Sequence, residues 1–179
     1  MRRRGPGDHA SNLCLRYLAA EGVPAVEYSE DAAERRRGPK MATLQANKDV
    51  VRRFYEAWNR GAIDFEALVA DEIVNYQPEA EPERGRDRFA AAIRGVMTAV
   101  PDSRWDVVEA IAEDDRVVVR ITWSGTYNAP QFRGASIPEP ARFSVEHIHI
   151  YRVADGRLAE HWVVRDDLTM LKQLQAITG

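Results

Sequence analysis

The chain has 179 residues, of which 45% are hydrophobic and 30% charged, and its formal net charge is -3. This composition indicates one globular domain with an extension, and the acidic balance offers no basic face for nucleic acid. Because Cys14 is the only cysteine, an internal disulfide and cysteine-based metal motifs are excluded, and a reducing, cytoplasmic setting is expected.

The first forty residues differ from the rest of the chain. They contain Gly-Pro and the charged run SEDAAERRRGPK, so we expect residues 1–40 to be largely disordered and residues 41–179 to form the domain. Arg16 interrupts the apolar stretch near the N-terminus, and no segment approaches the ~20 apolar residues of a membrane span. The sequence therefore favours neither export nor membrane insertion.

The segment from Thr43 has a helical pattern. Its large apolar side chains recur at i, i+3, i+4 and i+7, and Gly61 supplies the stop: Val51, Phe54, Tyr55 and Trp58. Such a stripe is typical of a core. One edge of it can also line a pocket, so Phe54 and Trp58 are candidate substrate contacts.

Further elements follow in chain order. Asp64 can cap a short helix, residues 72–78 form a brief strand, and residues 87–100 form a helix that stops before a proline. Two strands then occupy residues 104–127, and a proline-rich loop follows. Two more strands and a closing helix complete the pattern. Helices followed by a run of strands indicate an α+β fold with an antiparallel sheet folded over the helices.

Three of the four histidines lie in one window, FSVEHIHIYRVADGRLAEHW. His147 and His149 alternate along a strand and share a face. If Asp155-Gly156 forms a two-residue turn, His149 lies opposite Trp162, and His161 points away. If the turn has three residues, His149 lies opposite His161, and His147 lies opposite Val163. The residues alone leave both turns open.

The chain from Asn47 resembles the SnoaL-like polyketide cyclases, or ester cyclases, of the ketosteroid-isomerase-like group. The segments that carry the resemblance are VVRRFYEAWNRGAID, IVNYQPE, SGTYNAPQFRGASIPEPARFSVEHIHIYRVADGRLAEHW and DDLTMLKQL. The resemblance implies a cone-shaped α+β barrel, with N-terminal helices in the concave face of a curved antiparallel sheet around an apolar pocket. It also implies no metal or organic cofactor, and a homo-oligomer, either a dimer or a tetramer.

The resemblance further implies candidate site residues. In the family, an aspartate on the last strand moves the proton in an intramolecular aldol cyclisation, assisted by a histidine, a glutamine and an asparagine. The histidine position falls on His149, the glutamine position on His147, and the asparagine position matches Asn75. The aspartate position falls on Val163, which cannot accept a proton. The resemblance favours the three-residue turn, which places His161 and Val163 in the pocket as well.

Each of these residues also has a structural interpretation. His149 is expected to act as an acid/base group, with His147 beside it, although a hydrogen-bonded histidine can simply shape a cavity. Asn75 and His161 are expected to contact substrate. Asp166 and Asp167 are candidates for the missing carboxylate, although an Asp just before LTMLKQL is also a good helix cap, which is the role expected for one of the two.

Two functions fit this pattern. The first is a cyclase-type enzyme that performs cofactor-independent acid/base chemistry on a hydrophobic, polyketide-like small molecule. The second is a binding protein that kept the pocket and lost the chemistry with the aspartate. A facial site of three histidines could also hold zinc, but the resemblance speaks against a metal, and none is expected.

Overall fold

The computed structural model describes residues 41–78 and 80–177, so the expected disorder of residues 1–40 lies outside the described residues. The helices are α3 (Met41–Asn59), α4 (Phe65–Leu68), α5 (Arg86–Ala99) and α6 (Asp167–Gln173). The strands are β1 (Val69–Tyr76), β2 (Glu83–Arg84), β3 (Arg104–Glu113), β4 (Arg116–Tyr127), β5 (Gln131–Phe132), β6 (Ala135–Ser136), β7 (Ala141–Ala154) and β8 (Arg157–Arg165). No helix in this described part is long and apolar enough to cross a membrane.

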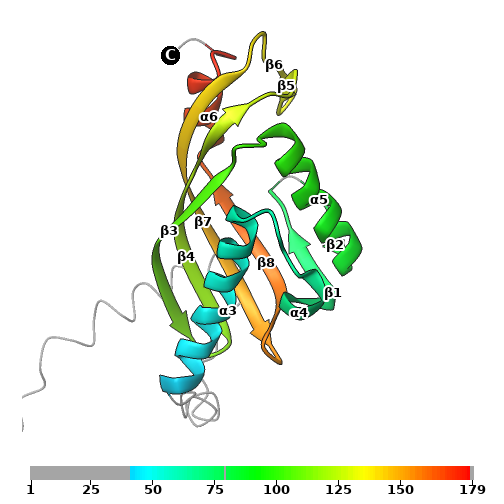
Figure 1. Cartoon of the computed structure of the whole chain (residues 1–179), viewed down its shortest axis with the longest axis vertical. Coiled ribbons are helices and arrows are strands. Elements are labelled where there is room, and N and C mark those ends of the chain that lie inside the picture. The colour runs from blue at the N-terminus through cyan, green and yellow to red at the C-terminus, as the bar shows by residue number, and fades with distance from the viewer. Residues whose placement is uncertain (1–40, 79, 178–179) are drawn as a thin grey trace, which may run out of the picture. The chain divides into compact units, whose positions relative to one another are not determined.

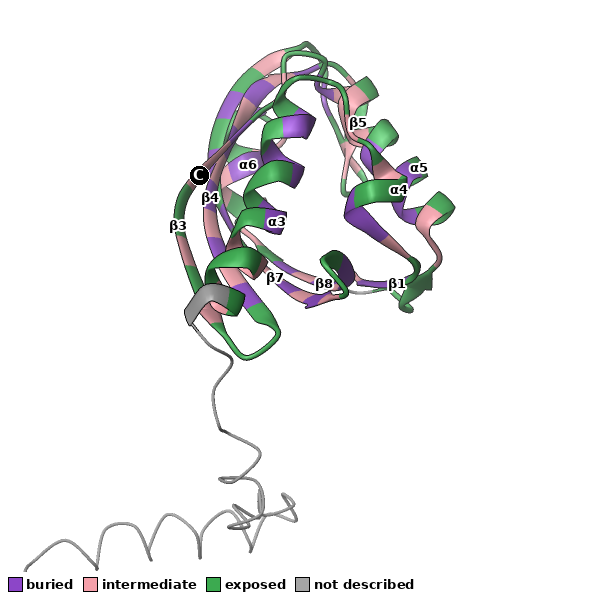
Figure 2. Cartoon of the chain, turned by 60° about the horizontal axis from the view of Figure 1, so that its bottom comes forward, coloured by how far each residue is buried: buried purple, intermediate pink, exposed green. Residues whose placement is uncertain are grey.

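The main sheet has the strand order β2-β1-β8-β7-β4-β3 and curves around α3 and α5 (Figure 1). Its long strands β3, β4, β7 and β8 pair antiparallel, whereas β1 runs parallel to β8. The predicted α+β class and curved sheet are confirmed, and the parallel pair is an addition to the prediction. Figure 2 shows α3 inside the curve, with its buried residues turned toward the strands.

Helix α3 is fixed to the sheet by its apolar stripe and by its last residue. Val51, Phe54 and Tyr55 are almost completely buried, as the spacing predicts. The Asn59 side chain donates to the Trp105 carbonyl and accepts from the Trp105 N–H, both at 2.8 Å. These two bonds hold the end of α3 against the beginning of β3, where one wall of the interior cavity starts.

The observed pairing of β7 with β8 differs from both of the registers expected from the sequence. Asp155 and Gly156 both have positive φ, at 49° and 70°, as a two-residue type I′ turn requires. Ala159 is then an extra residue on β8, because Val153 pairs with Leu158 while Arg152 pairs with Glu160. This bulge shifts the parity of every later residue of β8. The resulting cross-strand pairs are Tyr151 with His161, His149 with Val163, and His147 with Arg165.

The C-terminal helix α6 docks on β7. Asp166 is its N-cap and accepts from the Thr169 N–H at 3.0 Å, which confirms the capping role expected for one of the two aspartates. Gln173 accepts from the Ser144 N–H at 2.7 Å and donates to the Ser144 carbonyl at 3.0 Å. These contacts fix the end of β8 and the start of α6 beside the cavity.

Candidate active site

A cavity of about 360 Å³ lies between the inner face of the sheet and the helices α3 and α5. This volume is within the range of small-molecule pockets. Much of its wall is apolar, and its polar lining comes mainly from three strands, β1, β7 and β8, with Gln77 just beyond β1. The apolar side of the lining includes Trp58, Phe89, Ile93, Trp105, Trp123 and Val163. The polar side includes Asn75, Gln77, His147, His149, His161 and Arg165.

Six of the eight predicted site residues line this cavity. The three histidines and Asn75 are 2–6% exposed, and they are the buried polar residues of the described chain. Trp58 and Val163 belong to the wall as well. The bulge at Ala159 therefore gathers His161 with the other two histidines by a different route from the expected turn. Their functional roles remain predictions.

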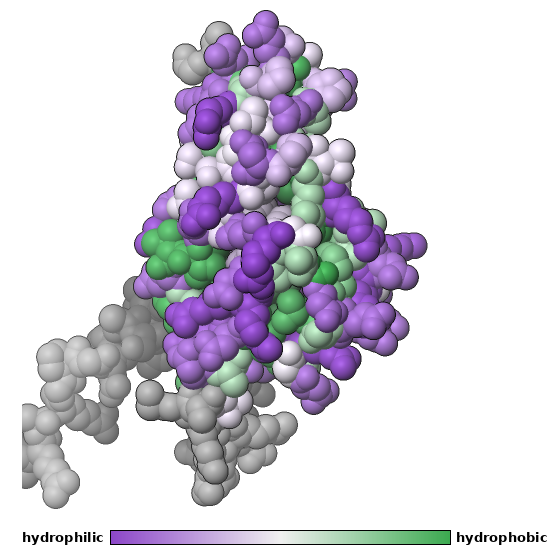
Figure 3. All heavy atoms as spheres, viewed as in Figure 1, coloured by the Kyte–Doolittle hydropathy of each residue, from purple (hydrophilic) through white to green (hydrophobic). Residues whose placement is uncertain are grey.

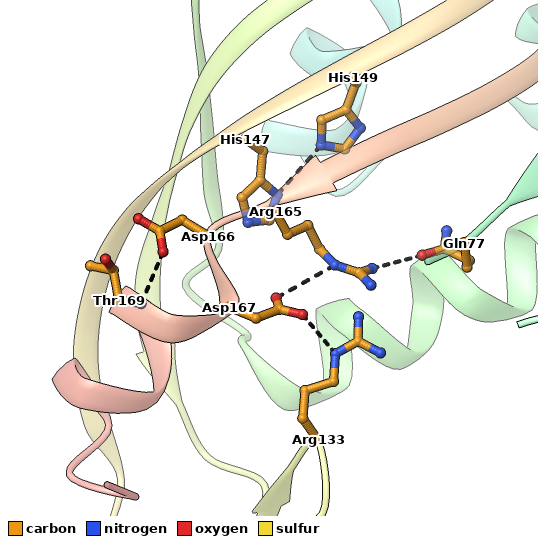
Figure 4. Close-up of polar contacts among 8 residues, drawn as sticks. All are labelled: Gln77, Arg133, His147, His149, Arg165, Asp166, Asp167 and Thr169. Atoms are coloured by element: carbon orange, nitrogen blue, oxygen red, sulfur yellow. Dashed lines mark hydrogen bonds and ion pairs between the residues drawn. The ribbon is translucent and has the colours of Figure 1, made fainter. Parts of the chain in front are cut away.

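Two predicted site residues lie outside the cavity wall. Phe54 is 0% exposed but packs among the aromatic rings of the core, with its centroid 5.7 Å from Trp58 and 6.1 Å from Phe89. Asp166 is exposed, and its carboxylate is held by the first turn of α6. In Figure 4 it turns toward Thr169 and away from Arg165. Neither side chain can reach a ligand in the cavity without leaving its packing or its cap.

A chain of hydrogen bonds begins at Arg165, which can only donate. Its Nη1 donates to Gln77 Oε1 at 2.7 Å, so the Gln77 amide nitrogen faces Asn75 and donates to Asn75 Oδ1 at 3.0 Å. Asn75 Oδ1 is also 2.7 Å from His161 Nδ1. Because that oxygen can only accept, His161 Nδ1 carries a proton and donates it.

The same reasoning assigns the tautomers of the other two histidines. In neutral His161 the second nitrogen, Nε2, must accept, so His149 Nδ1 donates to it at 2.8 Å. His149 Nε2 is then an acceptor for His147 Nδ1, a longer contact of 3.5 Å. The tautomer of His147 therefore leaves a bare lone pair on its Nε2. That atom is buried and has no hydrogen-bond partner among the described residues.

Burial keeps all three imidazoles neutral near pH 7. Desolvation lowers the pKa of His147 to about 4, although the charges of Asp167 and Asp166 oppose this shift. Desolvation lowers the pKa of His161 to about 3. The pKa of His149 is lowered well below its usual range by burial, and a charge on either neighbouring histidine would lower it further. The row is therefore a set of neutral donors and acceptors.

Val163 faces the cavity directly across from His149 and is 7% exposed. Glu83 of β2 is the carboxylate among the described lining residues, and its Oε2 lies 3.5 Å from Asn75 Nδ2. It is an exposed residue at the edge of the sheet. The position at which a carboxylate was expected is thus apolar, and the bare imidazole nitrogen of His147 is the better-buried proton acceptor.

Arg165, Gln77, Arg133 and Asp167 form the polar end of the cavity, and the sequence analysis missed them as a group. Asp167 joins the two arginines, with Oδ1 3.5 Å from Arg165 Nε and Oδ2 3.0 Å from Arg133 Nε (Figure 4). The sequence pattern could have indicated two of these residues, Arg165 and Gln77. Arg165 shares strand parity with Val163, and Gln77 is two residues beyond Asn75.

The histidine row is not arranged as a metal site. The ring nitrogens of His149 and His161 face each other at hydrogen-bond distance, which leaves no room for an ion between them. Within residues 41–78 and 80–177, no three His, Cys, Asp or Glu side chains form a group that could hold one. The facial zinc site considered from the sequence does not fit these positions.

Comparison with known proteins gives concordant matches. The model of the SnoaL-like polyketide cyclase family matches residues 48–174. Aklanonic acid methyl ester cyclase DauD from Streptomyces sp. strain C5 is 34% identical over an alignment of 134 residues that covers 70% of this chain and 80% of that protein.

Solved structures agree with this match. AclR from Streptomyces galilaeus, which is described as a putative hydroxylase and not as a cyclase, is 28% identical with a TM-score of 0.63, covering 75% of this chain and 99% of that one. IdmH from Streptomyces antibioticus is 29% identical with a TM-score of 0.61, covering 72% and 98%. The residues matched by the family model, 48–174, include the cavity lining and the strands of the main sheet.

Proposed function

The chain belongs to the SnoaL-like polyketide cyclase family, and from that premise we propose that it is a cyclase that closes a ring of a polyketide-like substrate by cofactor-independent acid/base chemistry. The observation that carries this proposal is the bare, buried Nε2 of His147 at the end of the histidine row. It supplies a proton acceptor in a cavity where the expected aspartate is Val163.

The cavity wall suits an oxygenated aromatic substrate. Tryptophan and phenylalanine rings provide flat apolar surface, and two of these residues add hydrogen-bond donors. The indole N–H groups of Trp58 and Trp105 are buried and have no partner within the described chain. A pocket with unpaired donors favours ligands that carry acceptor oxygens, because an apolar ligand would leave the donors unsatisfied. Since a 34% identical relative is an aklanonic acid methyl ester cyclase, we propose aromatic polyketide methyl esters as the substrate class.

The proposed reaction is an intramolecular aldol closure with His147 as the proton carrier. His147 Nε2 takes a proton from a carbon next to a carbonyl, and the electron pair of that C–H bond passes into the enolate. The enolate carbon attacks a second carbonyl, whose π electrons become an alkoxide. The alkoxide takes the proton from His147 Nε2, so atoms and charge balance and the product is an isomer of the substrate.

The histidine row sets the acid strength of this carrier. A protonated His147 in a desolvated pocket is a strong acid, since its pKa is about 4, and it returns its proton to an alkoxide readily. His149 Nε2 accepts from His147 Nδ1 and so stabilises the imidazolium while it exists. His161 and Asn75 hold His149 in the tautomer that this requires.

A second function has one observation in its favour. Val163 removes the family's carboxylate from the cavity, which fits a protein that binds its ligand without turning it over. The cavity and the histidine row would then serve recognition alone. The two functions share every binding contact and differ only in whether His147 moves a proton.

The test is turnover of aklanonic acid methyl ester and a panel of related aromatic polyketide methyl esters, followed by absorbance and mass. We expect His147→Gln to lower kcat by about 10²–10⁴, because it removes the general base and keeps a polar side chain of similar size. His149→Gln is expected to have a smaller effect, since His149 acts through its neighbour.

Two matched variants separate the alternatives. Glu83→Gln removes the lining carboxylate and is expected to keep kcat within a few-fold of wild type. If Glu83→Gln abolishes turnover and His147→Gln does not, the assignment of the base is wrong. If the wild-type protein binds the esters and converts none, while Val163→Asp converts them, the protein is a binder and the cyclase proposal fails.

A further inference from the structure

Arg165 has hydrogen-bond capacity that the protein does not use. Its Nη1 donates to Gln77 and its Nε lies 3.5 Å from Asp167 Oδ1 in an ion pair, whereas Nη2 is buried and has no partner among the residues that the structure describes. The side chain is 16% exposed and lines the cavity. An unpaired guanidinium N–H in a largely apolar cavity costs free energy unless a ligand accepts from it.

The strand register places this donor beside the free acceptor of the cavity. Arg165 on β8 is the direct cross-strand partner of His147 on β7, and both side chains are on the inner face. Opposite residues of an antiparallel pair have Cβ atoms about 4.5–5.5 Å apart. In Figure 4 the Arg165 guanidinium extends from the strand toward Gln77, so His147 and the Arg165 donors line the same end of the cavity without touching each other.

The local charge balance favours an anion. Two arginines, Arg133 and Arg165, share the single carboxylate of Asp167 at this end of the cavity. That group of three carries a net charge of about +1. A ligand atom with one negative charge would neutralise it, because the other carboxylate of the lining, Glu83, lies beside Asn75 and forms no ion pair with either arginine in the described structure.

We propose that Arg165 is the oxyanion-binding residue of this cavity, and that its ligand is a phenolate, enolate or carboxylate oxygen of an aromatic substrate. The arrangement allows one ligand to place a C–H bond at His147 and the adjacent oxygen at Arg165 Nη2. The negative charge that develops when His147 takes the proton then lies on the oxygen that Arg165 contacts. This deepens the proposed function and rests on the same cavity, but the anion subsite can exist without turnover.

The experiment is a spectrophotometric titration of bound 2-hydroxyanthraquinone, whose phenolate and phenol have different visible spectra. If Arg165 binds the oxyanion, the wild-type protein lowers the apparent pKa of the bound phenol below that of the free dye. Affinity for the phenolate should fall by about ten- to a hundredfold in Arg165→Met, as expected for a charge-assisted hydrogen bond. A bound dye in the wild-type protein with an unshifted or raised pKa overturns the proposal.

Three further variants test whether Arg165 itself causes the shift in the pKa of the bound dye. Gln77→Leu removes the partner of Arg165 Nη1 but leaves the charge and Nη2, so it should keep most of the pKa shift. Arg152→Met removes one positive charge from an outward-facing site paired with Glu160, and it should leave the shift unchanged. Arg165→Lys keeps the charge and should keep part of the affinity. If Arg152→Met abolishes the shift as fully as Arg165→Met does, Arg165 is not the direct ligand.

The probes also distinguish the possible sources of the oxygen. Anthraquinone-2-carboxylate tests the carboxylate, and 2-methoxyanthraquinone is the neutral control that should bind wild type and Arg165→Met alike. Failure of the two proposals is distinguishable. A phenolate shift that depends on Arg165 without any ester turnover leaves the subsite standing and removes the cyclase function. Turnover that is unchanged in Arg165→Met, together with an unshifted dye, removes the subsite and leaves the cyclase.

Discussion

Both faces of strands β7 and β8 carry residues that are unusual for their side of a sheet. On the inner face, His147, His149 and His161 are buried at 3–6% exposure. On the outer face of the same strands, Ile148 and Val164 are direct cross-strand partners at 42% and 66% exposure. Ordinary half-buried strands keep apolar residues inside and polar residues outside. Both departures from that rule raise the question of use, and we propose a reactive interior and an exterior covered by a second copy of the chain.

The outer face also carries an apolar row that crosses most of the sheet. Its members are cross-strand partners from β3 to β1: Ile111, Val118, Ile150, Trp162 and Tyr76. The Tyr76 and Trp162 rings stack with centroids 4.8 Å apart. The row is most exposed at its end on the edge strand β3, where Ile111 is 59% and the nearby Val108 50% exposed (Figure 3). This row is where we propose that the expected homo-oligomer forms.

The largest expected effect on stability comes from acidifying the inner face. The folded-state pKa values of His147 and His161, about 4 and about 3, lie below the usual 6.5, so the unfolded chain binds more protons between pH 4 and 6.5. The free energy of unfolding should therefore fall from pH 7 to pH 4 by on the order of 3 kcal/mol for each of these two histidines. Urea unfolding followed by tryptophan fluorescence measures it.

Variants assign this pH dependence to the inner face. The glutamine in His147→Gln cannot titrate between pH 4 and 6.5, so this variant should reduce the fall in the free energy of unfolding. Glu146→Gln, the neighbouring residue on the outer face, should leave the fall in this window largely unchanged. Asp102 and Asp166 have lowered pKa values because of their hydrogen bonds to Thr126 and Thr169, so the stability they contribute is lost only below about pH 4. An unchanged profile in His147→Gln would contradict the burial of a neutral imidazole.

A medium effect is expected at the Tyr55–Tyr151 pair, whose buried hydroxyl groups lie 2.7 Å apart. Burial raises the pKa of both, so both stay protonated and bond to each other. Tyr55→Phe should cost about 1–2 kcal/mol, because it leaves the Tyr151 hydroxyl buried and unpaired. The double variant Tyr55→Phe/Tyr151→Phe should cost less than the sum of the two single changes.

A double-mutant cycle from urea unfolding measures this coupling. Tyr76→Phe on the outer face is the matched control and should change the free energy of unfolding by less than about 0.5 kcal/mol. Strict additivity of the two inner changes would mean that the hydroxyl groups do not act as a pair.

The smallest effect on folding is expected on the outer face. Ile148→Lys combined with Val164→Glu replaces an exposed apolar pair with opposite charges that can pair across the strands. The protomer should stay within about 0.5 kcal/mol of wild type, while self-association should weaken. Light scattering coupled to size-exclusion chromatography measures the molar mass of the oligomer. A monomeric wild type, or an oligomer that the double variant leaves intact, would remove the proposed role of this face.

Much of the fold could be predicted because its signals are local. Helical spacing identified the α3 stripe, a stop before Pro101 identified the end of α5, and an aspartate before an apolar run identified the α6 cap. The site was less accessible. Val153, Leu158 and Ala159 are all apolar and all buried, so strict alternation of polar and apolar residues does not reveal the bulge near the turn. Both expected registers therefore differ from the observed one by at least one residue.

The sequence by itself determined that His147 and His149 share a face, that an Asp-Gly turn follows them, and that the chain resembles the SnoaL-like cyclases. Only the tertiary structure decided that His161 joins them and that Arg165 lies opposite His147. It also decided that His147 Nε2 is the bare nitrogen. The reason is physical: alternation along a strand is a property of the chain. Register, burial and tautomer depend on partners far away in sequence, such as Gln77 and Arg165, 88 residues apart.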